Sequence, residues 1–577
     1  MSSQRAHSGV RELPVVLLFA LCSVLLTRDH QKDDSPTFDE PFHVMAGAEY
    51  VENGTYGLNL EHPPLMKLLA GLALGRLHVT PPAPGSRVPS TGSDYFRFLY
   101  GNRAPAAAIV SEARRPFPWL LFGLVLLAWG IGSRVFGEGA GLLAAGLLAF
   151  DPNFIGHAAL VHTDVGAALA VLAAVGAALA ASARGGRFRW LLAGLVLGLA
   201  LATKFSAVLL VPFFLLVPFV PWQRRDPRER RRAVAGSMVA ILVGIGVLAG
   251  VYAVAMRRMP VADAVSAEVD FLRSRDATPG AIEAVTRLGR LVPPLGHYVA
   301  GLEGVSLLDT RGRGTNYLLG RTSSDRFLGY FFVAFLVKST PSFLLLAAAL
   351  AVFGRRQLLT PWPLGLLLAA AVFFAAAVRS HFNIGVRHIL PVYALLAVAG
   401  AGVLARQVKP RLFAWGGAAL VGLAALSAVR SHPEEIAYFN TIAGGTAGGA
   451  RWLSDSNIDW GQDLARLGTY LRARGWEKDT TVVAYSGLAA NYYARDCRVL
   501  DPARPLTPGR YAVSALMETI GPEFVQTFEG EESSRQLRRL LDLLKAHGRR
   551  IDRVGASFTI WELPTVEAAL LGPTRDG

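Results

Sequence analysis

Two neighbouring acids, Asp39 and Glu40, follow the first apolar run of the sequence. Charged groups beside hydrocarbon are costly, and they are commonly functional or paired. A carboxylate here could act as a general base that takes the proton of an attacking hydroxyl group. A second carboxylate and partial burial both favour the protonated form, so we expect a raised pKa for Asp39. The alternative is that both acids are simply solvated after the end of a helix.

A second polar cluster begins at His62, continues with Pro63 and Pro64, and ends at Lys67. Proline ends a preceding helix and suits the first turn of the next one. The sequence therefore predicts a helix that begins at this point, with His62 and Lys67 beside its N-terminus. Such an arrangement could bind a phosphate group. Lys67 could instead extend its charged end from an apolar surface towards water.

The short segment 151–164 lies between two apolar runs and contains Asp151, His157, His162 and Asp164. These residue types can bind a divalent cation, although their spacing matches no specific ligand signature. A metal site therefore stays open as one interpretation. Asp164 could instead bind an acceptor molecule, or it could cap a helix that begins at the next residue.

Four basic residues are predicted at outer membrane positions: Lys204 between two apolar runs, Lys338 before Pro341, and Arg387 with His388 in the connection before 389–404. Each lysine alone could extend towards water. Several cations on the side of Asp39 would together suit an anionic head group at the membrane surface. Arg387 is the first candidate among them, because a guanidinium can bind a phosphate through two parallel hydrogen bonds.

Segment 454–463 follows the last apolar run and contains Asp459 and Trp460 among other polar residues. One interpretation is that this segment contacts a glycan acceptor, with the Trp460 ring stacked on a sugar. The alternative is a polar cap that leads into a helix over 464–474, which the spacing of apolar residues predicts.

The elements that position these residues are predicted to be membrane-spanning helices. The chain has 577 residues, of which 52% are hydrophobic and 18% charged, and its mean hydropathy is +0.36. This composition excludes a disordered chain and is untypical of a cytosolic enzyme. About eleven apolar runs approach the length that crosses a bilayer. They lie near residues 13–26, 117–133, 140–150, 165–183, 190–203, 206–221, 234–255, 327–353, 363–378, 389–404 and 412–429.

The distribution of charge predicts how the helices are oriented. The formal net charge of +15 comes from residues 1–429, since acids and bases nearly balance in the rest of the chain. Alternate connections between the runs are basic, which places them and the N-terminus in the cytoplasm. The long connections 28–116 and 256–326 and the tail 430–577 would then lie outside, at the periplasmic face in a bacterium. Basic residues that flank spans give no indication of nucleic-acid binding.

We therefore expect a mostly α-helical, multi-pass protein of the inner (plasma) membrane, with two parts. Residues 1–429 form the membrane domain, and its first run is an uncleaved signal anchor. Residues 430–577 form a small soluble α/β domain, because helical and alternating patterns follow each other there. The two cysteines, Cys22 and Cys497, lie far apart in these two parts, so a disulfide or a cysteine metal site is not expected.

The order of the motifs resembles the polyprenyl-phosphate-dependent glycosyltransferases of the GT-C superfamily. Family 39 is the most similar; it includes protein O-mannosyltransferases and the bacterial transferases that attach aminoarabinose to lipid A. The resemblance covers roughly residues 10–405 and suggests a bacterial member. It rests on Asp39-Glu40, His62-Pro63-Pro64-Leu65, Asp151-Pro152-Asn153, His162-Thr163-Asp164, Thr203-Lys204 and Gly385-Val386-Arg387-His388-Ile389-Leu390-Pro391.

The resemblance implies a GT-C fold and a polyprenyl-phosphate sugar as the donor. It implies that Asp39 is the catalytic carboxylate with Glu40 beside it, and that Asp164 lies near the acceptor. Arg387, with Lys338 and Lys204, would hold the lipid phosphate. Direct displacement would invert the anomeric centre, and the acceptor would be a hydroxyl group of a protein, lipid or glycan.

Two other classes of function remain open from the sequence. A transporter or flippase of a lipid-linked or small anionic substrate would also have many helices and membrane-embedded charges. A binding scaffold could use the aromatic residues of the tail. The polar clusters lie in connections rather than within the spans, which favours the transferase.

Overall fold

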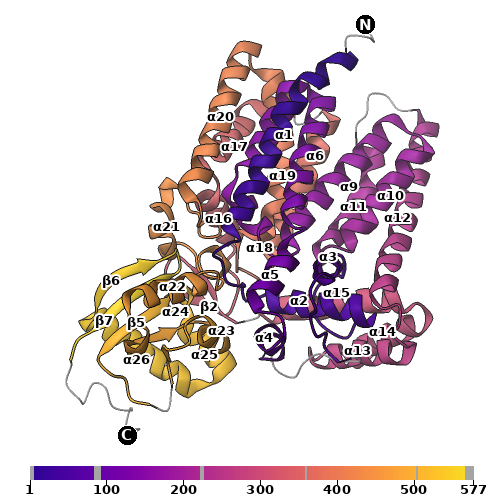
Figure 1. The fold of residues 1–577 in the computed structure, drawn as a ribbon. Coiled ribbons are helices and arrows are strands. Elements are labelled where there is room, and N and C mark those ends of the chain that lie inside the picture. The colour runs from indigo at the N-terminus through magenta and orange to yellow at the C-terminus, as the bar shows by residue number, and fades with distance from the viewer. Residues whose placement is uncertain are drawn as a thin grey trace.

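The computed structural model describes residues 5–83, 93–220, 226–312, 314–357, 360–501 and 504–565. A bundle of long helices forms one part of the molecule, and a small domain with a β-sheet forms the other (Figure 1). The small domain lies at the end of the bundle opposite the N-terminus. This architecture confirms the predicted fold class, which is a mostly helical membrane protein with a C-terminal α/β region.

Within the described ranges, seven helices are long and apolar enough to cross a membrane. Two bent helix pairs raise this number to nine if each pair is one span. The long segments contain α1 (Arg5–His30), α5 (Ala106–Arg114) with α6 (Pro118–Phe136), α9 (Asp164–Arg184), α12 (Pro227–Ala255), α18 (Pro361–Arg379), α19 (Leu390–Gln407) and α20 (Pro410–Ser431). Two other predicted runs form shorter helices, α10 (Arg187–Leu201) and α11 (Leu210–Leu216). All the predicted runs are helical, but fewer of them are continuous spans.

Both bends occur where a capped helix restarts at a proline. The pair α7 (Glu138–Ala149) and α8 (Pro152–Ala158) is bent by 59°, and the pair α16 (Tyr330–Lys338) and α17 (Pro341–Phe353) is bent by 119°. Asp151 and Thr340 cap the second helix of each pair. The Asn153 side-chain amide donates to the Lys338 carbonyl over 2.8 Å, so the two bends lie against each other.

The long connections form a layer of short helices at the same end as the small domain (Figure 1). The first connection contains α2 (Glu40–Ala48), α3 (Leu65–Leu74), α4 (Ser93–Tyr100) and α5, and the second contains α13 (Val261–Arg273), α14 (Pro279–Leu291) and α15 (Pro293–Arg311). Helix α3 begins where the prolines after His62 predict it. Helices α2 and α3 cross at Gly47 and Gly71, where a Cβ on Gly71 would lie 2.1 Å from the Gly47 carbonyl oxygen. Only glycine permits this close approach.

The C-terminal domain is built on a five-stranded sheet in the order β4-β3-β5-β7-β6. Its strands are β3 (Thr480–Val483), β4 (Arg498–Val499), β5 (Gly509–Ser514), β6 (Arg549–Val554) and β7 (Phe558–Leu563). Strands β4, β3 and β5 are parallel, and the β5–β7 and β7–β6 pairs are antiparallel. The predicted helix α22 (Leu464–Arg474) has the bounds that we expected, whereas the edge strands β4 and β6 carry too weak a pattern to be predicted.

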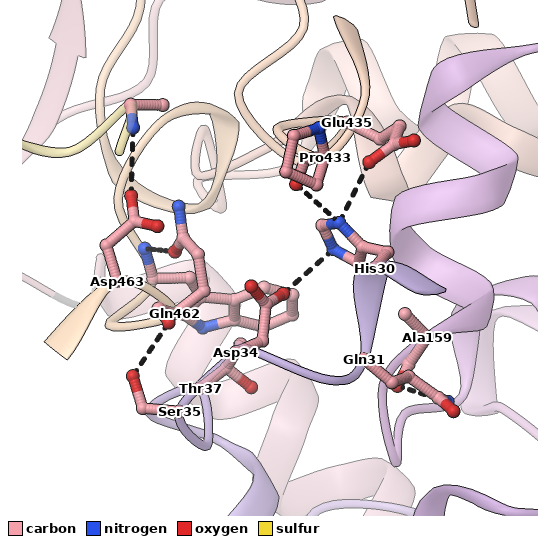
Figure 2. Close-up of polar contacts among 12 residues, drawn as sticks. His30, Gln31, Asp34, Ser35, Thr37, Ala159, Pro433, Glu435, Gln462 and Asp463 are labelled. Atoms are coloured by element: carbon pink, nitrogen blue, oxygen red, sulfur yellow. Dashed lines mark hydrogen bonds and ion pairs between the residues drawn. The ribbon is translucent and has the colours of Figure 1, made fainter. Parts of the chain in front are cut away.

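The segment between α20 and α22 joins the two parts through buried polar contacts (Figure 2). The two ring nitrogens of His30, at the end of α1, lie 2.9 Å from Asp34 and 2.8 Å from Glu435. The Ser35 hydroxyl donates to the Gln462 carbonyl over 2.7 Å. The connection that follows α1, and with it Asp39, is therefore held directly against the tail.

Candidate active site

A cavity of about 420 Å³ lies where the connection after α1, the α18–α19 connection and the C-terminal domain meet. Asp39, His62, Arg387, Asp455 and Trp460 form part of its wall. Apolar side chains of both domains contribute to the wall, among them Phe38, Phe382 and Phe524, together with further polar residues. Residues from distant parts of the chain thus surround one space at the end of the helical bundle.

Asp39 directs its carboxylate to two basic side chains. Its Oδ2 atom lies 3.1 Å from Nη1 of Arg387 and 3.3 Å from Nε2 of His162. Burial alone would raise the pKa of Asp39, but the hydrogen bond with His162 and the charge of Arg387 outweigh it and hold the pKa well below its usual value. The expectation of a raised pKa was wrong, because these cations, rather than Glu40, dominate the surroundings.

Glu40 faces away from the cavity. Its carboxylate forms a two-point ion pair with Arg114, at 2.7 and 2.6 Å, and accepts hydrogen bonds from the backbone amides of Thr37 and Val161. Both residues of the ion pair are fully buried. Glu40 therefore fastens α2 to α5 and to the connection before α9, and the geometry does not support the catalytic role that we expected from the sequence.

His162 is the first of three charged residues that contact one another in sequence, followed by Asp164 and Lys204. Its Nδ1 atom lies 2.5 Å from Asp164, whose other oxygen lies 2.5 Å from Nζ of Lys204. Burial lowers the pKa of His162, but Asp164 and Asp39 outweigh this effect and raise it. Asp164 is engaged by these two side chains and does not cap α9, whose N-cap residue is Thr163. Neither Asp164 nor Lys204 lines the cavity.

Arg387 lies at the centre of the cluster. Its guanidinium is 4.1 Å above the ring of Trp460, and its Nη1 is 2.9 Å from Nε2 of His162. Nε2 of His162 thus faces a donor, Arg387, and an acceptor, Asp39. A neutral His162 can accept from Arg387, whereas a protonated His162 can donate to Asp39. The position of one proton therefore decides which partner the imidazole binds.

The face of Trp460 that we expected to stack on a sugar is covered by Arg387. The ring also contacts His162 edge-on, with 5.1 Å between the ring centroids. Its indole is 4% exposed. Trp460 is therefore a platform for Arg387, and its neighbour Asp459 accepts hydrogen bonds from the amides of Gly461 and Leu516 inside the tail.

The two remaining candidate lysines bind backbone carbonyls instead of lining the cavity. Nζ of Lys67 donates to the carbonyls of Asn59 and His62 over 2.6 and 2.7 Å, which fixes the turn that carries His62. Nζ of Lys338 donates to the carbonyls of Ile436 and Asn457, each over 2.9 Å. Because each ammonium is fully buried by these contacts, neither is available to a phosphate in this structure. His388 is half-buried beside Phe331 and also lies outside the cavity wall.

Several residues of the cavity were not predicted. His43 follows Asp39 by one helical turn, and its ring lies 4.9 Å from that of His62 and 5.1 Å from that of His162 between centroids. Burial, together with the nearby charge of His162, lowers the pKa of His43. Residues four apart lie on the same face of a helix, so the spacing between Asp39 and His43 could have indicated that His43 belongs to the site. An ion pair between Arg275 and Glu61 also lines the cavity, and no sequence pattern marked Arg275.

The sequence left a divalent-cation site open as one interpretation. No group of three or more His, Cys, Asp or Glu side chains in the described parts of the chain is placed to hold a metal ion. His157 of the predicted set instead lies beside Trp460, and Nδ1 of its ring is 2.7 Å from the Asn153 carbonyl.

Residues 115–252 match the family model of dolichyl-phosphate-mannose-protein mannosyltransferases. The matched segment contains His162, Asp164 and Lys204. Within this segment, the match supports the resemblance to family 39 that the sequence motifs indicate. No protein with a curated description matches the chain.

Three solved structures show a distant similarity to the chain. The apo oligosaccharyltransferase of Archaeoglobus fulgidus is 15% identical (TM-score 0.43; 85% of this chain, 64% of that one). The donor-bound Pmt1–Pmt2 protein O-mannosyltransferase of S. cerevisiae is 18% identical (TM-score 0.36; 44% and 35%). ArnT of Cupriavidus metallidurans, bound to undecaprenyl phosphate, is 15% identical (TM-score 0.32; 97% and 99%). The chain thus spans less than two thirds of the first two proteins.

Proposed function

We propose that this membrane protein is a glycosyltransferase that moves a sugar from a polyprenyl phosphate to a hydroxyl group of an acceptor, with inversion at the anomeric carbon. The observation that carries the proposal is the contact of Asp39 with Arg387 inside a cavity at the end of the helical bundle. The contact places a proton acceptor and a phosphate ligand side by side, as this reaction requires.

In the proposed reaction, Arg387 binds the phosphate of the donor and Asp39 binds the hydroxyl group of the acceptor. The acceptor oxygen attacks the anomeric carbon, and the bond between that carbon and the phosphate oxygen breaks. The bonding electron pair leaves with the lipid phosphate, whose charge Arg387 stabilises. The proton of the hydroxyl group passes to Asp39.

The low pKa of Asp39 fits this role once the donor is bound. The carboxylate is ionised in the empty site, because Arg387 and His162 favour its charged form. A phosphate on Arg387 neutralises part of that positive charge and adds a negative charge nearby, and both changes raise the pKa of Asp39. The donor therefore makes the carboxylate a stronger base at the moment when a base is needed.

The charge pattern supports an active site on the outer face of the membrane. Basic residues gather at the other end of the bundle, among them Arg134 and Arg184 at the ends of their helices and Arg228 near the start of α12. Such residues favour the cytoplasm. The cavity and the C-terminal domain then face the exterior, where the acceptor is a protein, a lipid or a glycan.

Purified full-length protein in proteoliposomes, supplied with radiolabelled undecaprenyl-phosphate mannose and candidate acceptors, tests the proposal. Covalent label on an acceptor, with release of undecaprenyl phosphate, is the expected result. A panel of other lipid-linked sugars identifies the donor that is used best. Label that crosses the bilayer still attached to its lipid, with no covalent transfer from any donor, would contradict the proposal and support a flippase.

A further inference from the structure

Asp455 differs from the other carboxylates of the cavity, because in the described residues no cation forms an ion pair with it. Asp39 faces Arg387, and Glu61 is paired with Arg275. Asp455, from the C-terminal domain, lines the same cavity but forms no ion pair within the described ranges. Within the described residues, its carboxylate accepts one hydrogen bond, from the amide of the next residue, Ser456, over 2.5 Å. Its other oxygen is therefore free to accept a hydrogen bond from a bound molecule.

The backbone holds Asp455 in an unusual conformation. Its φ is +57°, in the left-handed region that residues other than glycine and asparagine or aspartate seldom adopt. The next two residues fix the turn: the Ser456 hydroxyl donates to the Ile384 carbonyl, and the Asn457 side chain accepts from the Val386 amide over 3.1 Å. These contacts hold Asp455 in its left-handed conformation at the wall of the cavity.

The same contacts place Asp455 beside the phosphate ligand. Val386, which binds Asn457, directly precedes Arg387 in the chain. Burial raises the pKa of Asp455 to about 6, while the positive charge of Arg387 acts in the opposite direction. The carboxylate is thus mainly ionised at neutral pH, close to Arg387, and directed to the cavity.

We propose that Asp455 binds a hydroxyl group of the sugar on the lipid-linked donor, so that the C-terminal domain supplies part of the sugar site. This inference rests on the proposed function, in which Arg387 binds the donor phosphate. The sugar is bonded directly to that phosphate, so its ring must lie next to Arg387. A carboxylate accepts strong hydrogen bonds from the hydroxyl groups of a sugar, whereas it repels the negative charge of a phosphate.

The test compares two lipids that differ only in the sugar, undecaprenyl-phosphate mannose and undecaprenyl phosphate. Their affinities for the purified full-length protein are measured by titration in nanodiscs. Asp455→Asn keeps the shape of the side chain and tolerates the left-handed backbone, and Asp455→Gly removes the side chain without strain. Asp542→Asn makes the same change in charge on an exposed position of α26 (Glu531–His547) and is the matched control.

We expect wild-type protein and the Asp542→Asn control to bind the mannosylated lipid more tightly than the bare phosphate. Both variants of Asp455 should bind the mannosylated lipid roughly 10- to 100-fold more weakly, as for the loss of a hydrogen bond to a charged group. Their affinity for undecaprenyl phosphate should stay the same or increase, because a negative charge near the phosphate has been removed.

Opposite effects on the two lipids separate a sugar contact from a structural role. Equal weakening of both lipids by Asp455→Asn, or no effect on either, overturns the sugar contact and leaves the proposed function standing. Equal affinity of the wild type for the two lipids also overturns the sugar contact. Failure of the wild type to bind either lipid overturns the proposed function, and this inference with it.

Discussion

Arg387 contacts three partners with different surfaces of one planar group. Its nitrogen Nη1 reaches Asp39 and His162, and its face lies on Trp460. A lysine could keep the charge but neither the stacking nor the two-point geometry. We therefore expect Arg387→Lys to raise the KM for the lipid-linked donor by about 10-fold or more, with a smaller effect on the KM for the acceptor. Steady-state kinetics with each substrate varied in turn measures both constants, and an unchanged donor KM would reduce Arg387 to a structural role.

Asp455 should make the folded protein less stable at neutral pH. Its folded pKa, about 6, lies above the ordinary value of 3.8, so folding disfavours the charged form. This destabilisation is fully present above pH 6 and disappears as the pH falls from 6 towards 4. Asp455→Asn carries no titrating group, so it should be more stable than wild type at pH 8, by on the order of 1–2 kcal/mol. Thermal unfolding in detergent at several pH values measures the difference, which should shrink towards pH 4.5; a difference that grows on acidification would contradict the assignment.

At the scale of elements, segment 454–463 connects the two domains at the active site. Asn457 donates to the hydroxyl of Tyr330 in α16 over 2.8 Å and accepts from the amide of Val386, and its carbonyl accepts from Lys338. The side chain of Asn457 is fully buried. Its contacts set the position of the residue next to Val386, which is Arg387.

Asn457→Ala leaves a buried hydroxyl and a buried amide without partners, which typically costs about 1–3 kcal/mol each. We expect a lower unfolding temperature, together with a loss of kcat/KM for each folded molecule, because Arg387 is no longer held in register. Thermal unfolding and kinetics on the same preparation give both values. Asn491→Ala, at an exposed position of α23 (Gly487–Tyr493), is the control and should change neither. Lower stability with normal kcat/KM would show that Asn457 does not position Arg387.

The sequence predicted elements well where a local pattern exists, as for α22 and the start of α3. It also marked Asp39 and Arg387, because a charged residue near an apolar run is conspicuous. It could not show that Lys67 binds carbonyls of the turn before it, that Lys338 binds carbonyls of a distant segment, or that Glu40 pairs with Arg114. Those partners are set by tertiary structure. The 119° bend at Ser339 was not predicted, although the polar residues Ser339 and Thr340 and the proline at 341 interrupt the apolar run there.

For the whole molecule, the distribution of charge and the position of the cavity predict the same sidedness. All basic connections would lie in the cytoplasm, and the domain built on β3–β7 would lie outside. A reporter enzyme fused after residue 577, active only in the periplasm, should therefore be active in a bacterial host. The same reporter fused in the α9–α10 connection should be inactive. The reverse pattern would place the cavity on the cytoplasmic face and exclude an exterior acceptor.

The account as a whole depends on Asp39 as the base and on Glu40 as a structural neighbour. The most direct measurement is turnover for each folded molecule of Asp39→Asn and Glu40→Gln, with folded protein quantified by size-exclusion elution. Asp39→Asn keeps the shape but cannot take the proton, so kcat should fall by roughly 10²–10⁴-fold while the donor still binds. Glu40→Gln leaves Arg114 buried without its partner, so the yield of folded protein should fall far more than kcat. Normal turnover by Asp39→Asn would contradict the account, as would an inactive but fully folded Glu40→Gln.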